Sequence, residues 1–162
     1  MSTRPSVCMF VMNSVLPDPR VMREARTLVQ SGWSVTIVGL HDERRAESVR
    51  DGIRIIFDCG EITQMLLTNI AMQRAGVSVR AQVYHSHDLN TLIAGYLASR
   101  FKNALLVYDF HEAYTEQFPH DASTACWRGF YTLLERLLIR KADRLITVCA
   151  SLSRWAQERY AA

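Results

Sequence analysis

Short apolar runs rich in valine and isoleucine alternate along this chain with longer segments in which apolar residues recur at helical spacing. The short runs lack the apolar and polar alternation of a strand with one face in water, so both of their faces are expected to be buried. Such strands are expected at residues 7–12, 34–40, 53–58, 82–87, 105–109 and 144–148. Their alternation with helices predicts the α/β class, here a Rossmann-like, doubly wound parallel sheet with helices on both faces.

The segment after the first expected strand carries the clearest helix signals. Asp18 is a good N-cap, Pro19 suits the first helical position, and Gly32 ends the helix before the next strand. Its apolar face comprises Val21, Ala25, Leu28 and Val29, and its polar side chains Arg20, Arg23, Glu24 and Arg26 are expected elsewhere. Further helices are expected at residues 62–73, 89–100, 124–141 and 151–160, with a polar surface loop at 41–52.

The composition fits one folded domain in a reducing compartment. The chain has 162 residues, of which 49% are hydrophobic and 22% are charged, and this is enough apolar material for a core. No apolar run reaches the roughly 18–20 residues of a membrane-spanning helix, and the first residues lack a cleavage site for a leader. The four cysteines have no CxxC spacing and are expected to be small buried hydrophobes, Cys149 included. We therefore predict a cytoplasmic protein.

Two common classes of binding protein are disfavoured. Basic and acidic residues number 19 and 16, a formal charge of +3, and they alternate along most of the chain, which argues against a nucleic-acid partner. Residues 13–20, which follow the first expected strand, contain no glycine. A dinucleotide fingerprint and a P-loop both need glycines at that point, so a nicotinamide-dependent dehydrogenase and a P-loop NTPase are not expected.

The ends of the fourth and fifth expected strands carry the densest group of ionisable residues: His85, His87, Asp88, Asp109, His111 and Glu112. Residues two apart on a strand share a face, so His85 pairs with His87. Asp109 pairs with His111 in the same way, and at this spacing a carboxylate can orient an imidazole. The arrangement suits a catalytic or sugar-binding histidine. The alternative is that these residues only cap helices and satisfy loop backbone.

Other chemistry at the same strand ends is less favoured. Zinc is one alternative, because His85 and His87 with a carboxylate supply suitable ligand types. No cysteine pair joins them, however, and Thr115 stands where the H-E-x-x-H motif needs its second histidine. We therefore expect no metal. Ser86 lacks the G-x-S-x-G turn, which disfavours a nucleophilic hydrolase.

The segment 127–144 is amphipathic, with aromatic and leucine residues on a helix that ends in several arginines. This composition would suit a membrane surface. We prefer a core helix whose basic end complements the dipole of its last carbonyl groups.

Four blocks of the sequence resemble one family. Residues 18–38, DPRVMREARTLVQSGWSVTIV, are similar to the first helix and second strand of family 4 glycosyltransferases, the retaining GT-B enzymes. HDLNT at 87–91 and YDFHE at 108–112 resemble the paired strand-end motifs of that family. Glu135, followed by residues 142–152, resembles the last segment of its N-terminal domain.

The resemblance implies that residues 1–162 form the N-terminal, acceptor-side domain of such an enzyme, and that the donor-binding C-terminal domain is absent from the chain. It implies transfer of a hexose from a UDP- or GDP-sugar to a glycan or lipid-linked acceptor, with retention and without a metal or other cofactor. The chain alone is then expected to be inactive. Its expected place is the cytoplasm, with peripheral contact to the inner face of the membrane as a further possibility.

Site residues follow from the resemblance by position. His111 matches the family's histidine that approaches the transferred sugar, so it is the expected catalytic residue. The residues expected to bind acceptor or substrate are Asp18, Arg20, His87, Asp88 and Glu112. Two alternatives remain open: a stand-alone acceptor-binding or membrane-docking subunit that pairs with a separate donor-binding chain, and a metal-dependent hydrolase built on the histidine cluster.

Overall fold

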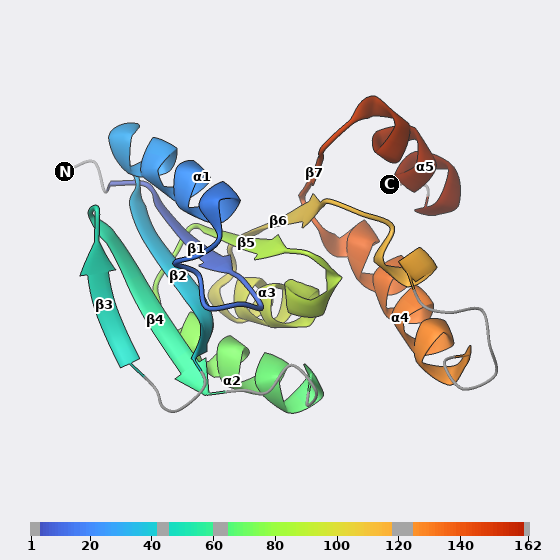
Figure 1. Cartoon of the computed structure of the whole chain (residues 1–162), viewed down its shortest axis with the longest axis horizontal. Coiled ribbons are helices and arrows are strands. Elements are labelled where there is room, and N and C mark those ends of the chain that lie inside the picture. The colour runs from blue at the N-terminus through green and yellow to red at the C-terminus, as the bar shows by residue number, and fades with distance from the viewer. Residues whose placement is uncertain (1–3, 42–45, 60–64, 118–124, 161–162) are drawn as a thin grey trace.

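A seven-stranded sheet with the order β3-β4-β2-β1-β5-β6-β7 forms the centre of the molecule (Figure 1). The computed structural model describes residues 4–41, 46–59, 65–117 and 125–160. The strands are β1 Ser6–Phe10, β2 Ser34–His41, β3 Ala46–Arg50, β4 Ile53–Cys59, β5 Val83–His87, β6 Leu105–Phe110 and β7 Arg144–Thr147. Neighbouring strands run parallel except for β3 and β4. The predicted Rossmann-like α/β fold is confirmed.

Helices cover both faces of this sheet. They are α1 Pro19–Gln30, α2 Met65–Ser78, α3 Leu89–Lys102, α4 Ala125–Leu138 and α5 Ala150–Tyr160, with 3-10 turns η2 Tyr114–Gln117 and η3 Ile139–Lys141. Successive side chains of a strand point to opposite faces. In β1, Val7 and Met9 therefore pack with α1, whereas Cys8 and Phe10 pack with α2 and α3. Figure 1 shows α1 and α2 on opposite sides of the sheet.

The expected loop at residues 41–52 is wrong in one respect, because it contains the edge strand β3. This strand pairs antiparallel with β4 through a two-residue turn at Asp51 and Gly52. Both turn residues have positive φ, 54° and 76°, as a type I′ hairpin turn requires. All five residues of β3 are exposed. The strand thus lacks the buried apolar run by which the other strands were predicted, and the Asp-Gly pair was its only strong signal.

The cysteines are less buried than expected. Cys8 in β1 is fully buried, but Cys126 and Cys149 are exposed. Cys126 lies in the first turn of α4, and Cys149 follows β7, an edge strand whose residues alternate between half-buried and exposed. The prediction of a core position for Cys149 is therefore wrong.

Helix α4 is also less buried than a core helix. Its buried residues are Tyr131 and Glu135. Its large exposed side chains are Trp127, Phe130, Leu133 and Leu137. A stripe of apolar surface thus runs along the outer side of α4.

A buried carboxylate links this helix to the sheet and to α5. Glu135 is fully buried and accepts a hydrogen bond from the Tyr108 hydroxyl of β6 at 3.2 Å. It accepts a second from the Tyr160 hydroxyl at the end of α5. Arg140 donates to the backbone carbonyl of Tyr160 at 2.7 Å. Three elements distant in sequence are thus joined at one polar group.

We expect Glu135→Ala to lower the free energy of unfolding by about 2–4 kcal/mol, because two tyrosine hydroxyls would be left buried without an acceptor. Glu135→Gln is the matched control, since its amide can still bond both hydroxyls and should cost less than half as much. Urea unfolding followed by tryptophan fluorescence measures both. Equal stability of the Ala variant and wild type would contradict this role for the carboxylate.

The same residue gives the stability a pH dependence of definite sign. Burial raises the pKa of Glu135, although the hydrogen bonds from Tyr160 and Tyr108 oppose the shift. A carboxyl whose pKa is raised by folding stabilises the fold while it is protonated, and this contribution is lost as the pH rises through the folded pKa. The stability of wild type relative to Glu135→Gln should therefore be greatest below about pH 4 and should decrease toward neutral pH. A constant difference across a pH series of urea titrations would rule this out.

Candidate functional site

The loop that leaves β1 is held by side-chain contacts instead of by glycines. The Asn13 side chain donates to the Asp18 carboxylate at 2.9 Å and accepts from the backbone N–H of Val15 at 2.8 Å. Asp18 in turn accepts from the backbone N–H groups of Arg20 and Val21, at 3.1 and 3.2 Å. The predicted N-cap of α1 is thus confirmed. Burial alone would raise the pKa of Asp18, but the hydrogen bonds from Asn13 and the backbone outweigh it and lower the pKa.

The same loop explains one glycine in β2. Val15 is fully buried and has a positive φ of 60°, which is strained for a β-branched residue. Its side chain occupies the space that a Cβ at Gly39 would need. Packing against this glycine therefore holds the loop, and with it the start of α1, against the sheet.

Replacing Asp18 by Ala removes the acceptor for two N–H groups at the start of α1. We expect the free energy of unfolding to fall by about 1 kcal/mol, the usual cost of a lost N-cap. Asp18→Asn keeps an acceptor oxygen and should retain most of the stability. Urea unfolding of the two variants provides the test, and a wild-type midpoint for Asp18→Ala would show that the cap contributes nothing.

Arg20 and Asp88 connect the first turn of α1 with the start of α3. The Arg20 guanidinium is 45% exposed and lies 3.7 Å from the Asp88 carboxylate and 4.0 Å from that of Asp18. Asp88 occupies the N-cap position of α3 with φ of 67°, yet its side chain makes no capping hydrogen bond. Burial raises the pKa of Asp88, and the Glu112 carboxylate adds to this, whereas His111 and Arg20 oppose it. Its carboxylate is thus turned toward Arg20 and not toward the helix backbone.

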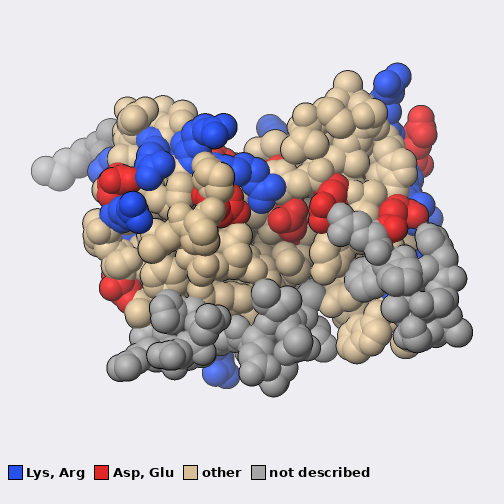
Figure 2. Space-filling model, viewed as in Figure 1, with Lys and Arg blue, Asp and Glu red and all other residues tan. Residues whose placement is uncertain are grey.

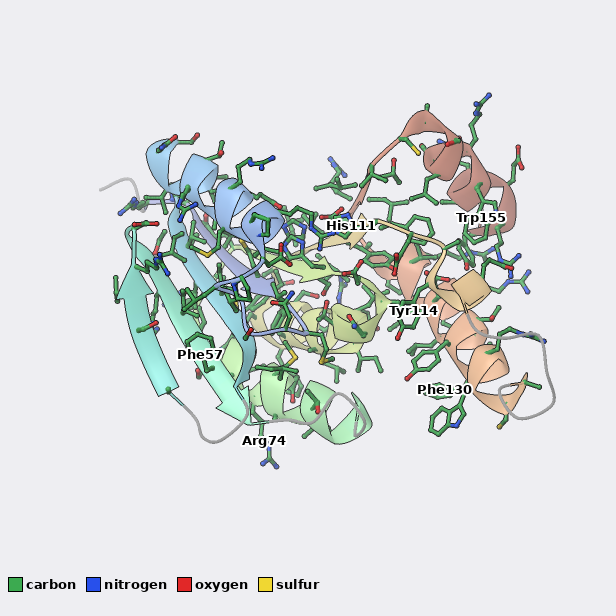
Figure 3. The ribbon with its side chains drawn as sticks, in the orientation of Figure 1. Phe57, Arg74, His111, Tyr114, Phe130 and Trp155 are labelled. Carbon is green, nitrogen blue, oxygen red and sulfur yellow. The ribbon has the colours of Figure 1, made fainter. Side chains whose placement is uncertain are left out.

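A group of four ionisable residues lies beside this pair, and we call it the imidazole cluster. It consists of Glu24 of α1, His85 and His87 of β5, and Asp109 of β6. The two histidine rings stack with centroids 4.2 Å apart. His85 Nδ1 lies 3.1 Å from a Glu24 oxygen, and His87 Nδ1 lies 3.2 Å from Asp109 Oδ2. His111, which directly follows β6 (Figure 3), places its Nε2 2.8 Å from the same Asp109 oxygen. His85 Nε2 is more distant from this oxygen, at 4.0 Å, so Asp109 Oδ2 has three imidazoles around it and lies close to two of them.

The charges of this group follow from its contacts. Burial alone would raise the pKa of Asp109, but the His111 and His87 contacts outweigh it and hold the pKa well below its usual range. Burial also lowers the pKa of His87, against the opposing effect of Asp109. For Glu24, burial is outweighed by the contact with His85, and the pKa is lowered. At neutral pH both carboxylates are therefore ionised beside a neutral His87.

The structure places five of the six expected site residues in two groups at the carboxyl edge of the sheet: Asp18, Arg20 and Asp88, and His87 and His111 around Asp109. The backbone N–H of Asp88 joins the groups by donating to the Asp109 carbonyl at 3.2 Å. Glu112 is exposed and acts on the group mainly through its charge near Asp88. The His111 side chain is only 9% exposed, and its ring is enclosed by ionisable groups. On the face shown in Figure 2, basic side chains lie over α1, with acidic side chains beside them toward the middle of the molecule.

Glu24 is part of the site but was not among the residues predicted from the sequence. Its position four residues after Arg20 puts the two on one side of α1, and this spacing was the available signal. The hydrophobic pattern of α1 identifies its apolar face. It does not distinguish polar side chains that face water from polar side chains that reach toward the strand ends.

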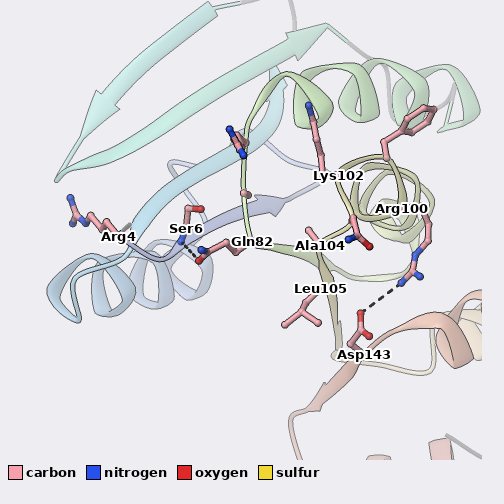
Figure 4. A pocket seen from close by; sticks show the side chains of 12 residues that line it. Arg4, Ser6, Gln82, Arg100, Lys102, Ala104, Leu105 and Asp143 are labelled. Atoms are coloured by element: carbon pink, nitrogen blue, oxygen red, sulfur yellow. Dashed lines mark hydrogen bonds and ion pairs between the residues drawn. The ribbon is translucent and has the colours of Figure 1, made fainter. Parts of the chain in front are cut away.

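A cavity of about 1000 Å³ lies at the opposite, amino edge of the sheet (Figure 4). Its charged lining residues are Arg4, Arg80, Arg100, Lys102 and Asp143. Arg100 and Lys102 belong to the last turn of α3, where cations complement the helix dipole, and Arg100 pairs with Asp143 at 3.8 Å. These contacts explain the basic side chains of α3 here, and the cavity lies at the edge of the sheet away from the candidate site.

Residues 17–162 match the family described as Glycosyl transferase 4-like domain. The chain belongs to this family. The resemblance of the four sequence blocks to family 4 glycosyltransferases is thereby confirmed. Comparison with curated proteins by sequence gave no match.

The fold of this glycosyl transferase 4-like domain is shared by two solved structures of sucrose-phosphate synthase from Thermosynechococcus elongatus. One matches with a TM-score of 0.71 at 12% identity and covers 97% of this chain but 45% of that chain. The other matches with a TM-score of 0.66 at 10% identity and covers 94% of this chain and 81% of that chain. The domain therefore spans less than half of the first synthase chain. Within the described residues, no helix is long and apolar enough to cross a membrane.

Proposed function

We propose that this domain is the acceptor-side half of a retaining glycosyltransferase. The complete enzyme would move a hexose from a UDP- or GDP-sugar to the hydroxyl of a glycan or of a lipid-linked acceptor. One observation carries the proposal: within a glycosyl transferase 4-like domain, Arg20 lies 3.7 Å from Asp88, whose backbone N–H donates to the carbonyl of Asp109. The Asp109 side chain in turn contacts His111 at 2.8 Å. In open α/β sheets ligands bind beyond the carboxyl ends of the strands, which is this edge.

The charge and exposure of each residue indicate its role in binding the substrates. Arg20 offers a half-exposed guanidinium, which suits an anionic or polyhydroxylated acceptor. Asp18 and Asp88 hold that guanidinium, and Asp88 and Glu112 can accept hydrogen bonds from sugar hydroxyls. His111 would approach the transferred sugar from the acceptor side. His87 would help to position His111, because both imidazoles contact the carboxylate of Asp109.

The donor would be held by a second domain. The leaving diphosphate needs cations to stabilise its charge, and we assign these to the donor-binding domain with no metal in the reaction. The new glycosidic bond forms between the acceptor oxygen and the anomeric carbon as the bond to the diphosphate breaks, and the proton of the acceptor hydroxyl passes to the leaving diphosphate. This chain would supply the wall of the cleft that holds the acceptor.

Assays with labelled UDP- and GDP-sugars test this division of labour. The 162-residue chain alone is expected to give no turnover, whereas the same chain joined to a donor-binding domain of the family should transfer sugar. A panel of glycan and lipid-linked acceptors identifies the substrate. Turnover by the chain alone would contradict the proposed division, and failure of every joined protein would contradict the transferase function.

The exposed stripe on α4 favours a second candidate, a membrane-docking subunit that pairs with a separate donor-binding chain. Leu133 and Leu137 are exposed one turn apart, and Arg136 and Arg140 lie close to them in sequence. Such a surface suits the inner face of an anionic membrane. Cosedimentation with vesicles that contain anionic lipid should then be lost in a Leu133→Glu, Leu137→Glu variant. Equal recovery of wild type and variant would remove this candidate.

A further inference from the structure

The imidazole cluster contains several buried polar atoms without a hydrogen-bond partner. Within the described part of the chain these include Nε2 of His85, Nε2 of His87 and Oδ1 of Asp109. The side chain of His87 is completely buried and that of His85 is 5% exposed. A buried polar atom without a partner costs free energy, so native proteins usually satisfy such atoms with a water molecule or an ion.

The cluster has the ligand types and the spacing of a cation site. Each of its four residues offers one ligand atom, and these atoms all lie within 4.8 Å of one another. Bonds of about 2.0–2.2 Å to a tetrahedral zinc ion place ligand atoms about 3.5 Å apart, so a closure of about 1 Å is needed. Histidines two apart on β5 point the same way, and Glu24 and Asp109 face them from α1 and β6.

We infer that the imidazole cluster binds one divalent cation of the zinc type, which joins α1 to β5 and β6. Glu24 and Asp109 bring two carboxyl groups to the cluster, and a divalent cation would offset their negative charge. Two nitrogen and two oxygen ligands favour zinc over magnesium or calcium, which prefer oxygen ligands only.

The cation would act on structure and not on the transfer reaction, so this inference is independent of the proposed function. Oδ1 of Asp109 has no hydrogen-bond partner, while Oδ2 contacts His111. Asp109 can therefore bind the cation through one oxygen and orient His111 through the other. No metal was expected from the sequence, because no cysteine pair joins the histidines and Thr115 stands where the H-E-x-x-H motif needs its second histidine. Glu24 was not among the ligands that the sequence suggested, and the structure places it beside His85.

Cobalt(II) titration provides the test, because tetrahedral cobalt absorbs visible light and zinc displaces it. The chain should carry Cys126→Ser and Cys149→Ser, which remove the exposed thiols of the described residues. We expect one cobalt ion per chain, a tetrahedral spectrum without thiolate bands, and release of cobalt by zinc. Zinc should also raise the melting temperature, since it binds the folded state.

Glu24→Gln and His85→Gln should each weaken binding at least 10-fold and remove most of the melting-temperature shift. Glu24 is one-third exposed, so Glu24→Gln is the variant expected to keep the fold in any case. Glu112→Gln, an exposed acid just outside the cluster, is the matched control and should bind as wild type does. Absence of stoichiometric binding, or binding that neither Glu24→Gln nor His85→Gln weakens, would overturn the inference.

Discussion

In the proposed complete transferase, His111→Ala is expected to lower kcat by about 10²–10⁴-fold, the usual contribution of a positioned histidine. Asp109 holds the imidazole at 2.8 Å at the edge where the acceptor would lie, so the variant would lose the proposed contact of His111 with the transferred sugar. The fold should persist, because the ring belongs to the polar site and not to the apolar core. Steady-state kinetics with the identified acceptor measure the effect.

The control for His111→Ala is Lys102→Ala at the opposite edge of the sheet. Lys102 is exposed beside the amino-edge cavity, and its loss should change kcat by less than about twofold. A His111→Ala enzyme with near wild-type kcat would remove this residue from the proposed machinery while leaving the family and fold unaffected.

The second large effect is expected at Asp109. Asp109→Asn keeps the size of the side chain but removes the charge that two imidazoles share, at 2.8 Å from His111 and 3.2 Å from His87. A misplaced His111 ring should reduce kcat by about 10²-fold with little change in KM. The loss of the close carboxylate contacts to the two buried imidazoles should also lower the free energy of unfolding by about 1–3 kcal/mol.

A separate readout distinguishes misplacement of the ring from general damage at Asp109. The nitrogen chemical shifts of the His111 side chain report which ring nitrogen carries the proton, and they should change in Asp109→Asn. The Asp88→Asn variant, which removes a nearby acid without direct contact to the His111 ring, should leave them unchanged. An Asp109→Asn protein with unchanged His111 shifts and unchanged kcat would show that Asp109 does not position the ring.

The strands that could be predicted are those whose physical signal is local. Residues 34–40 and 105–109 are mostly apolar because most of their side chains are buried, and both lie within strands of the structure, β2 and β6. The Asp18 cap was predictable because its bonds reach only two and three residues along the chain. By contrast, β3 has no buried residue, and its pairing depends on β4.

The site was predictable only in part, because contacts between distant segments decide it. The strand-end histidines were evident, since the carboxyl ends of β5 and β6 meet at one edge. Glu24 was missed because its partner His85 lies 61 residues away, and nothing local separates it from a solvated acid. The exposure of Cys149 was also missed, because a short apolar run does not reveal that its strand stands at the sheet edge.

We propose that the carboxyl edge of the sheet forms the acceptor wall of a glycosyltransferase cleft. Amide chemical-shift mapping of the labelled chain with the panel of glycans and lipid-linked acceptors tests it most directly. We predict that the acceptor perturbs residues 13–20, 87–91 and 109–112 together and leaves the amino edge unchanged. Perturbations confined to the amino-edge cavity, around Arg80 and Lys102, would contradict the account.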